Sequence, residues 1–231
     1  MNLWNSTTKV LIFCAHPDDE TLGCGGTIAK MVKSGVHVTV VCATGGETGV
    51  DCSKKYAENI KEHRNKELQT ATKMLGVSRL INLGISCQKV QNDQKTFHEF
   101  IRLIRQTEPD IILTHSTNDH HRDHRAVHTI TKEAVWKAYE DIHPELGNPH
   151  RAGLLLEYEV LQLISDPELL VDTTNFHEVK QKALRIYQSQ ENIITGAHQF
   201  IDAAAIVRGH AAGCKFAEAF RVVKTHPCVI E

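Results

Sequence analysis

The chain has 231 residues, 41% hydrophobic and 23% charged, which is enough for one globular domain with a substantial core. Its formal net charge of −2, from 26 basic and 28 acidic side chains, argues against the strongly positive surface of a nucleic-acid-binding protein. No apolar run reaches the roughly 18 residues of a membrane-spanning helix, and Met1–Lys9 is too polar for a secretion signal. Seven scattered cysteines without a CxxC pair favour a reducing compartment, so we expect a cytoplasmic protein.

Apolar and amphipathic segments alternate along residues 1–140. Short apolar or β-branched runs predict strands at 9–15, 36–43, 79–83 and 110–115. Longer segments with one hydrophobic face predict helices at 27–34, 56–75, 97–107 and 123–139. This repeated alternation predicts an α/β fold of the Rossmann-like, three-layer type, with a mostly parallel sheet between two layers of helices.

Residues 141–231 have a less regular pattern. Prolines and glycines mark a loop at 143–153, and the expected elements are strands within 154–164 and at 169–172 and 217–223, and helices at 176–189 and 197–212. No low-complexity linker or internal repeat divides the chain. We therefore expect a single domain over 1–231, in which 141–231 completes the substrate site.

Two polar turns, at 16–20 and 116–124, hold the densest acid and histidine content of the chain. They follow the first and fourth predicted strands. Ligands of doubly wound sheets bind outside the carboxyl ends of the strands, so both turns lie on the expected functional edge.

The spacing within these turns predicts a metal site. His16 and Asp19 are three residues apart in a tight turn and can converge on one ion, with Asp18 beside the ion but not bound to it. His121 and His124 share a face in the first turn of a helix. Two imidazoles and a carboxylate, with a position left for water, match catalytic zinc. The alternatives are a helix cap in the first turn and solvated histidines in the second, but two such turns on one sheet edge favour the metal.

Two further residues are candidate substrate contacts. Arg64, near the start of the second predicted helix, could reach a phosphate or carboxylate group, although a surface ion pair with Glu67 fits equally well. Glu47 follows the second predicted strand and could contact sugar hydroxyls or remain a solvated loop acid. The sequence leaves both alternatives open.

Several segments resemble the N-acetylglucosaminyl de-N-acetylase superfamily, also called PIG-L or LmbE-like deacetylases. The family motifs His-Pro-Asp-Asp-Glu and His-x-Asp-His are matched at 16–20 and 121–124. Further matches are a small-residue helix start, a His-Arg-x-x-Glu-Leu segment and an Ala-Glu-Ala-Phe ending, at Gly23–Thr27, His63–Leu68 and Ala217–Phe220. Arg122 differs, because proline is common there in the family, and this difference concerns the substrate more than the reaction.

The resemblance implies an LmbE-like fold and a metal-dependent hydrolase that removes an N-acetyl group from an N-acetylglucosamine-type conjugate. It implies His16, Asp19 and His124 as ligands of Zn²⁺, with Fe²⁺ or another divalent metal as alternatives. The implied partner is a small amino-sugar substrate, with no nucleic acid and no intrinsic membrane span. Association into a homo-oligomer is left open.

The resemblance also implies the acid–base roles. Asp18 would be the general base that takes a proton from the attacking water. His121 would stabilise the oxyanion or protonate the leaving amine, and Asp123 would orient His121.

Other classes of protein fit the sequence less well. Glycines at 23–26 faintly suggest a nucleotide-binding loop, but G-x-G-x-x-G is absent and the acidic turn before it would repel a pyrophosphate. A non-haem iron oxygenase also uses two histidines and a carboxylate, usually on a β-barrel. A non-catalytic metal-binding protein needs no base at Asp18. The main alternative is a related zinc amidase for another N-acyl amino sugar.

Overall fold

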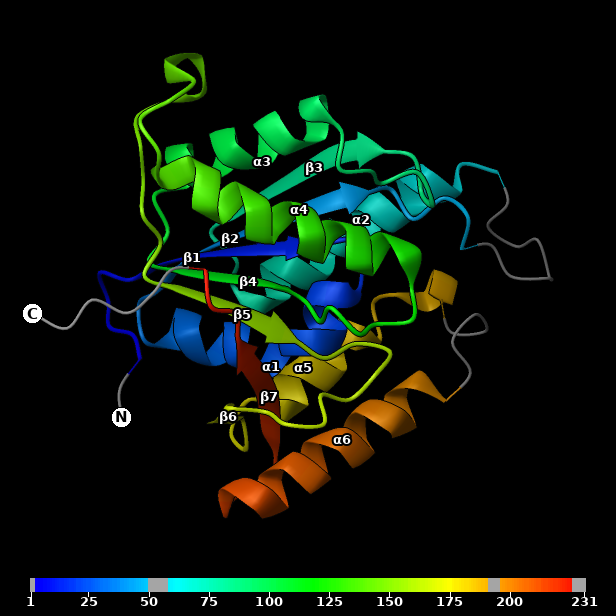
Figure 1. Ribbon diagram of the computed structural model, residues 1–231. Helices are drawn as coiled ribbons and strands as arrows, with labels where there is room; N and C mark the ends of the chain where they lie inside the picture. The colour runs from blue at the N-terminus through cyan, green and yellow to red at the C-terminus, as the bar shows by residue number, and fades with distance from the viewer. Residues whose placement is uncertain (1–2, 50–57, 191–195, 226–231) are drawn as a thin grey trace, which may run out of the picture.

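The structure, a computed structural model, describes residues 3–49, 58–190 and 196–225 (Figure 1). Seven strands form one sheet in the order β3-β2-β1-β4-β5-β7-β6. The strands are β1 (Lys9–Cys14), β2 (His37–Thr44), β3 (Arg79–Ile85), β4 (Ile111–His115), β5 (Leu154–Tyr158), β6 (Leu169–Asp172) and β7 (Ala217–Val222). Strands β1 to β5 are parallel, and β7 runs antiparallel between β5 and β6. The predicted mostly parallel α/β sheet is confirmed, and β5, β6 and β7 of the carboxy-terminal part extend the same sheet.

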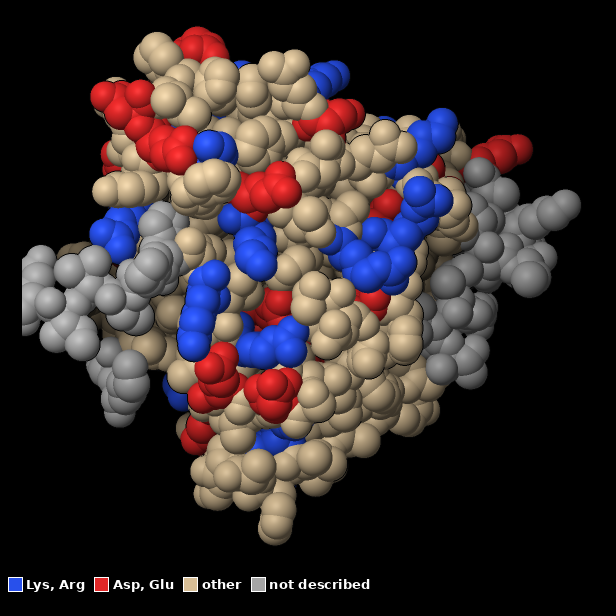
Figure 2. Space-filling model, in the orientation of Figure 1, with Lys and Arg blue, Asp and Glu red and all other residues tan. Residues whose placement is uncertain are grey.

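Helices cover both faces of the sheet. They are α1 (Asp19–Lys33), α2 (Ile60–Leu75), α3 (Gln94–Thr107), α4 (Arg122–Tyr139), α5 (His177–Leu184) and α6 (Ala197–Ala212), with short 3₁₀ turns at Pro144–Leu146 and Gln188–Gln190. Figure 1 shows α3 and α4 on one face, with α1 and α5 on the other. Within the described residues, no helix is both long and apolar enough to cross a membrane. Figure 2 shows basic and acidic side chains intermixed on the face in view.

The central strand β1 is buried on both sides because its residues alternate between two hydrophobic clusters. Ile12 and Cys14 pack into the cluster that includes α1 and α2, whereas Leu11 and Phe13 pack into the cluster that includes α3 and α4. The ring of Phe13 stacks on that of Phe100 with centroids 4.3 Å apart. A continuous apolar run in the sequence therefore corresponds to a strand between two helical layers.

Helix α1 begins at Asp19, eight residues before the predicted start, and breaks its helical geometry at Cys24. The glycines that suggested a loop instead permit close packing, since a Cβ at Gly23 would lie 2.3 Å from the ring of Tyr158 on β5. Beyond the break, Glu218 on β7 accepts hydrogen bonds from the backbone N–H groups of Gly26 and Thr27, at 2.9 and 2.7 Å. A distant strand thus caps the second half of the helix, which local sequence cannot reveal.

Other boundaries shift by a few residues. The strand expected within 154–164 ends at Tyr158, and the helix expected at 176–189 ends at Leu184 before the second 3₁₀ turn. Helix α2 begins at Ile60, and the predicted residues 56 and 57 lie outside the described part of the chain. None of these shifts moves the two motif-bearing turns from the ends of β1 and β4.

Candidate metal centre and active site

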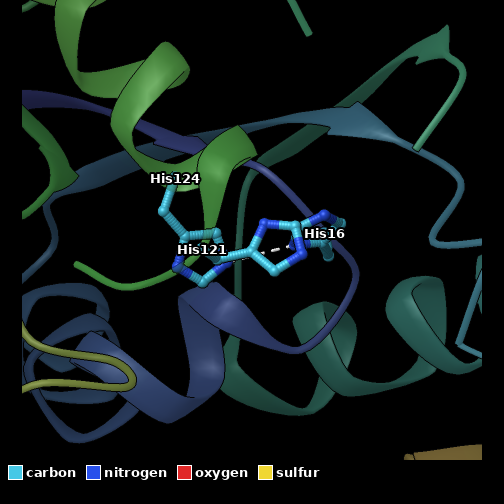
Figure 3. A group of neighbouring side chains, drawn as sticks. All are labelled: His16, His121 and His124. Atoms are coloured by element: carbon cyan, nitrogen blue, oxygen red, sulfur yellow. Dashed lines mark hydrogen bonds between the residues drawn. The ribbon is translucent and has the colours of Figure 1, made fainter. Parts of the chain in front are cut away.

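The strand order reverses between β1 and β4, and both motif-bearing turns meet there. After β1 the chain turns through His16 and enters α1, while His121 is the N-cap residue of α4. Figure 3 shows the imidazole rings of His16, His121 and His124 converging from these two segments. The centre therefore lies at the topological switch point that the alternating pattern predicted.

His16, Asp19 and His124 come together as a compact donor set. His16 Nδ1 lies 3.1 Å from His124 Nε2, and the two oxygens of Asp19 lie 3.3 Å from these nitrogens, one each. Tetrahedral coordination with bonds of about 2.0–2.1 Å separates neighbouring ligands by about 3.3 Å. The donor types and spacings thus fit a divalent metal ion. His121 also has a ring nitrogen within 4.8 Å of those of His16 and His124.

Each of the two candidate ligand histidines has a carboxylate next to its other ring nitrogen. His16 Nε2 lies 3.2 Å from Asp123 Oδ2, and His124 Nδ1 lies 3.0 Å from Asp119 Oδ1. Carboxylates in this position orient metal-binding imidazoles and increase their basicity. Asp119 was missed in the sequence, although it belongs to the same acidic turn.

The arrangement around Asp123 differs from the prediction that its carboxylate orients His121. The backbone N–H of Asp123 donates to His121 Nδ1 at 3.1 Å as a helix cap. The Asp123 carboxylate instead faces His16 and accepts a hydrogen bond from the Gln88 backbone N–H at 2.6 Å. The backbone hydrogen bond thus occupies His121 Nδ1, so this nitrogen is not available to the Asp123 carboxylate.

The charges of this cluster favour a cation. Burial disfavours a protonated His124, but Asp19 and Asp119 outweigh it and raise its pKa to about 9. Burial also lowers the pKa of His16, but hydrogen bonds to Asp123 and Asp19 outweigh burial and raise this pKa. Because only the neutral imidazoles can bind a metal, an ion bound here would compete with protons.

Asp18 lies beside this cluster in an unusual backbone conformation. Its φ angle is 114°, and its backbone N–H donates to Glu20 Oε2 at 3.2 Å. The side chain is almost fully buried, and burial raises the pKa of Asp18 to about 7 despite the opposing charge of Arg64. A carboxyl group with such a pKa can exchange protons near neutrality.

Arg64 is buried beside Asp18 and does not form the surface ion pair considered for it. It is only 3% exposed, and its Nη2 forms an ion pair with Asp18 Oδ2 at 2.9 Å while also donating to the Pro17 carbonyl. Its Nη1 donates to the carbonyl of Gly46 at 2.9 Å. The carboxylate of Glu67, the partner in that alternative, instead accepts hydrogen bonds from Ser189. Arg64 therefore positions Asp18, although it also borders the cavity described below.

Glu47 is half-buried, and its Oε1 accepts a hydrogen bond from the Cys87 backbone N–H at 2.7 Å. It thus braces a neighbouring loop. Cys87 itself was missed in the sequence, and its thiol lies close to His16 and Asp123. Its position could have identified it as a candidate site residue, because it follows β3 by two residues and lies on the same sheet edge as the other turns.

A cavity of about 260 Å³ opens over the cluster. His16, Asp18, Asp19, His121 and His124 all line it. Apolar side chains from Leu22, Val160 and Leu161 complete part of the wall. The cavity therefore brings a candidate base, a candidate metal site and a third imidazole to one small space.

Comparison with known proteins adds to this geometry. The model of the GlcNAc-PI de-N-acetylase family, PIG-L, matches residues 11–135, more than half of the chain. The chain belongs to this family. The match contains both motif-bearing turns and the segment that carries Arg64.

Relatives of the chain are similar over most of its length. Diacetylchitobiose deacetylase of Thermococcus kodakarensis is 28% identical over 95% of this chain and 85% of the relative. The structure of N,N'-diacetylchitobiose deacetylase from Pyrococcus horikoshii superposes with a TM-score of 0.86 at 27% identity, covering 94% of this chain and 84% of that one. GalB of Pseudomonas putida, a 4-carboxy-2-hydroxymuconate hydratase, has a TM-score of 0.84 at 23% identity, with 97% and 98% coverage. That last likeness concerns the fold alone.

Proposed function

We propose that this chain is a zinc-dependent N-deacetylase that releases acetate and a free amine from an N-acetylglucosamine-type conjugate. The observation that carries the proposal is the single cavity shared by the His16–Asp19–His124 donor set and the Asp18 carboxylate. Family membership and the deacetylases among the relatives support the same reaction. The exact sugar conjugate, and the choice of zinc over Fe²⁺, belong to the proposal.

In the proposed reaction His16, Asp19 and His124 hold the ion. Bound zinc supplies a Lewis acid that polarises the amide carbonyl and acidifies water. Asp18 accepts the proton of the attacking water and passes it to the departing nitrogen. Arg64 keeps Asp18 oriented and favours its ionised form, so it acts as a positioning residue.

His121 is proposed to serve the oxyanion. Because its Nδ1 accepts the backbone hydrogen bond of Asp123, its neutral ring carries the proton on Nε2. Burial, together with His16 and His124, lowers the pKa of His121, which favours this neutral donor form. A neutral N–H that donates to the developing oxyanion stabilises the transition state more than the substrate.

The experiment is an amine-release assay on purified, zinc-loaded protein with a panel of N-acetylglucosaminides that includes diacetylchitobiose. We expect equal amounts of acetate and free amine, and loss of both with Asp18→Asn. Stoichiometric metal without amine release from any member of the panel would indicate a non-catalytic metal protein. Absence of bound metal after loading would remove the basis of the proposal.

A further inference from the structure

A second group of metal-binding side chains lies on the other nitrogen of His16. The Cys87 thiol, His16 and the Asp123 carboxylate each offer one donor atom, and these atoms lie within 4.8 Å of one another. All three residues are buried, with exposures of 7%, 8% and 0%. We propose that Cys87, His16 and Asp123 form a second metal site, selective for thiolate-binding divalent ions such as Zn²⁺ and Cd²⁺.

The donor geometry supports joint coordination. His16 Nε2 and Asp123 Oδ2 are 3.2 Å apart, close to the roughly 3.3 Å between neighbouring nitrogen and oxygen ligands of a tetrahedral ion. Among the described residues, Asp123 Oδ1 is one of the buried polar atoms without a hydrogen-bond partner. Asp123 Oδ2 faces His16 and accepts the Gln88 N–H, while Oδ1 is unpartnered, so the carboxylate has unused capacity to bind a cation.

The thiol is also placed for coordination. The Thr48 hydroxyl donates to Cys87 Sγ at 2.9 Å, and both residues line the catalytic cavity, which provides a route of entry. On binding, the thiol loses one proton to water, and a thiolate and a carboxylate then balance the charge of a divalent ion. Thiolate favours soft ions, so Mg²⁺ and Ca²⁺ are excluded by the same donor set.

The two sites share one imidazole. His16 Nδ1 belongs to the first donor set and Nε2 to the second. Simultaneous occupancy requires the ring to release its remaining proton and bridge two ions, and it breaks the contact between Asp123 and His16. Excess zinc should therefore inhibit the enzyme through the Cys87 site, an effect that rests on the proposed function.

The binding test does not depend on activity. The full chain, first loaded with one equivalent of Zn²⁺, is titrated with Cd²⁺ while the thiolate-to-metal charge-transfer absorption is recorded. We expect the band in wild type, its loss in Cys87→Ser and its retention in Cys214→Ser, a control at a partly exposed thiol that does not line the cavity. No band in wild type, or an equal band in Cys87→Ser, overturns the site.

Two further measurements cover the remaining outcomes. If circular dichroism shows that Cys87→Ser does not fold, X-ray absorption on wild-type protein loaded with two zinc ions provides the test. We expect one sulfur ligand per two zinc ions, and the absence of sulfur ligands would overturn the site.

In the activity measurement, Cys87→Ser should need about 10-fold more zinc for half-inhibition than wild type or Cys214→Ser. Failure of catalysis with a normal cadmium band would refute the deacetylase proposal and leave the metal site standing.

Discussion

Arg64 and Asp18, 46 residues apart in the chain, form a buried ion pair with Nη2 2.9 Å from Oδ2, at the wall of the candidate active site. The same guanidinium group holds the carbonyls of Pro17 and Gly46. Arg64 thereby fixes both the position and the charge of the proposed base. Its removal should change the pH dependence of the reaction as well as its rate.

The first prediction concerns Arg64→Met. Asp18 acts in its ionised form, so kcat/KM should rise with pH through the Asp18 pKa. Arg64 lowers that pKa, which burial raises to about 7, so its loss should move the acidic limb to higher pH. Arg64→Lys, which keeps a positive charge, should shift the limb less. Identical acidic limbs in all three proteins would show that Arg64 does not control Asp18.

The second prediction concerns metal content. Because His124 and Asp19 belong to the donor set, His124→Ala and Asp19→Asn should bind far less than one zinc per chain while their far-ultraviolet spectra remain native. His37→Ala, a change at an exposed histidine on β2, is the matched control and should bind normally. Elemental analysis after gel filtration measures the ratio. Near-stoichiometric zinc in His124→Ala would rule out this ligand set.

The third prediction is a pH dependence of zinc affinity. His124 must be neutral to bind, and its pKa is raised to about 9 by Asp19 and Asp119 against the effect of burial. Below that pKa a proton competes with the ion, so affinity should increase by about 10-fold per pH unit for each proton displaced, and then level off. Competition with a chromogenic chelator at several pH values tests this. A pH-independent constant would contradict it.

The fourth prediction concerns the base. Asp18→Asn is nearly isosteric but cannot accept a proton, so zinc should remain bound while kcat falls by ~10²–10⁴-fold. Metal analysis and turnover should be measured on the same preparation. A near-normal rate with normal zinc content would assign the base elsewhere.

The fifth prediction separates Asp123 from His121. The Asp123 carboxylate faces His16, so Asp123→Asn should weaken zinc binding by about 10- to 100-fold. His121→Ala should retain zinc and lose turnover, because only its proposed oxyanion contact is removed. With the first site filled and no excess zinc present, the two effects on turnover should be close to additive. Normal zinc affinity in Asp123→Asn with strong non-additivity would restore the arrangement expected from the sequence.

Much of the fold was predictable because its signals are local. The apolar runs of β1 and β4 identify buried strands, and their order along the chain places His16 and His124 at one edge. Convergence of the two turns follows from the topology of parallel sheets, without knowledge of any side-chain contact. Local sequence patterns therefore predict which segments of the chain come together.

The partners of individual side chains were not predictable. Asp123 has both a carboxylate and a backbone N–H within reach of a ring, and the N-cap geometry of α4 decided which of them His121 received. The choice between a substrate contact and a surface ion pair was left open for Arg64, because its burial and its pairing with Asp18 depend on how α2 packs beside the first turn. Such choices depend on tertiary packing, since a shift of about one hydrogen-bond length exchanges one partner for another.

The hydrogen bonds from Gly26 and Thr27 to Glu218 span 192 and 191 residues, and Lys180 on α5 completes the contact at 2.6 Å. Helix α1, which begins three residues after His16, is thus secured by a strand that is synthesised much later than the helix itself. A nascent chain that carries both candidate metal-binding turns still lacks this cap until β7 has been made. Stable metal loading should consequently follow translation of β7 rather than accompany synthesis of the first half, so incomplete chains would not sequester the ion.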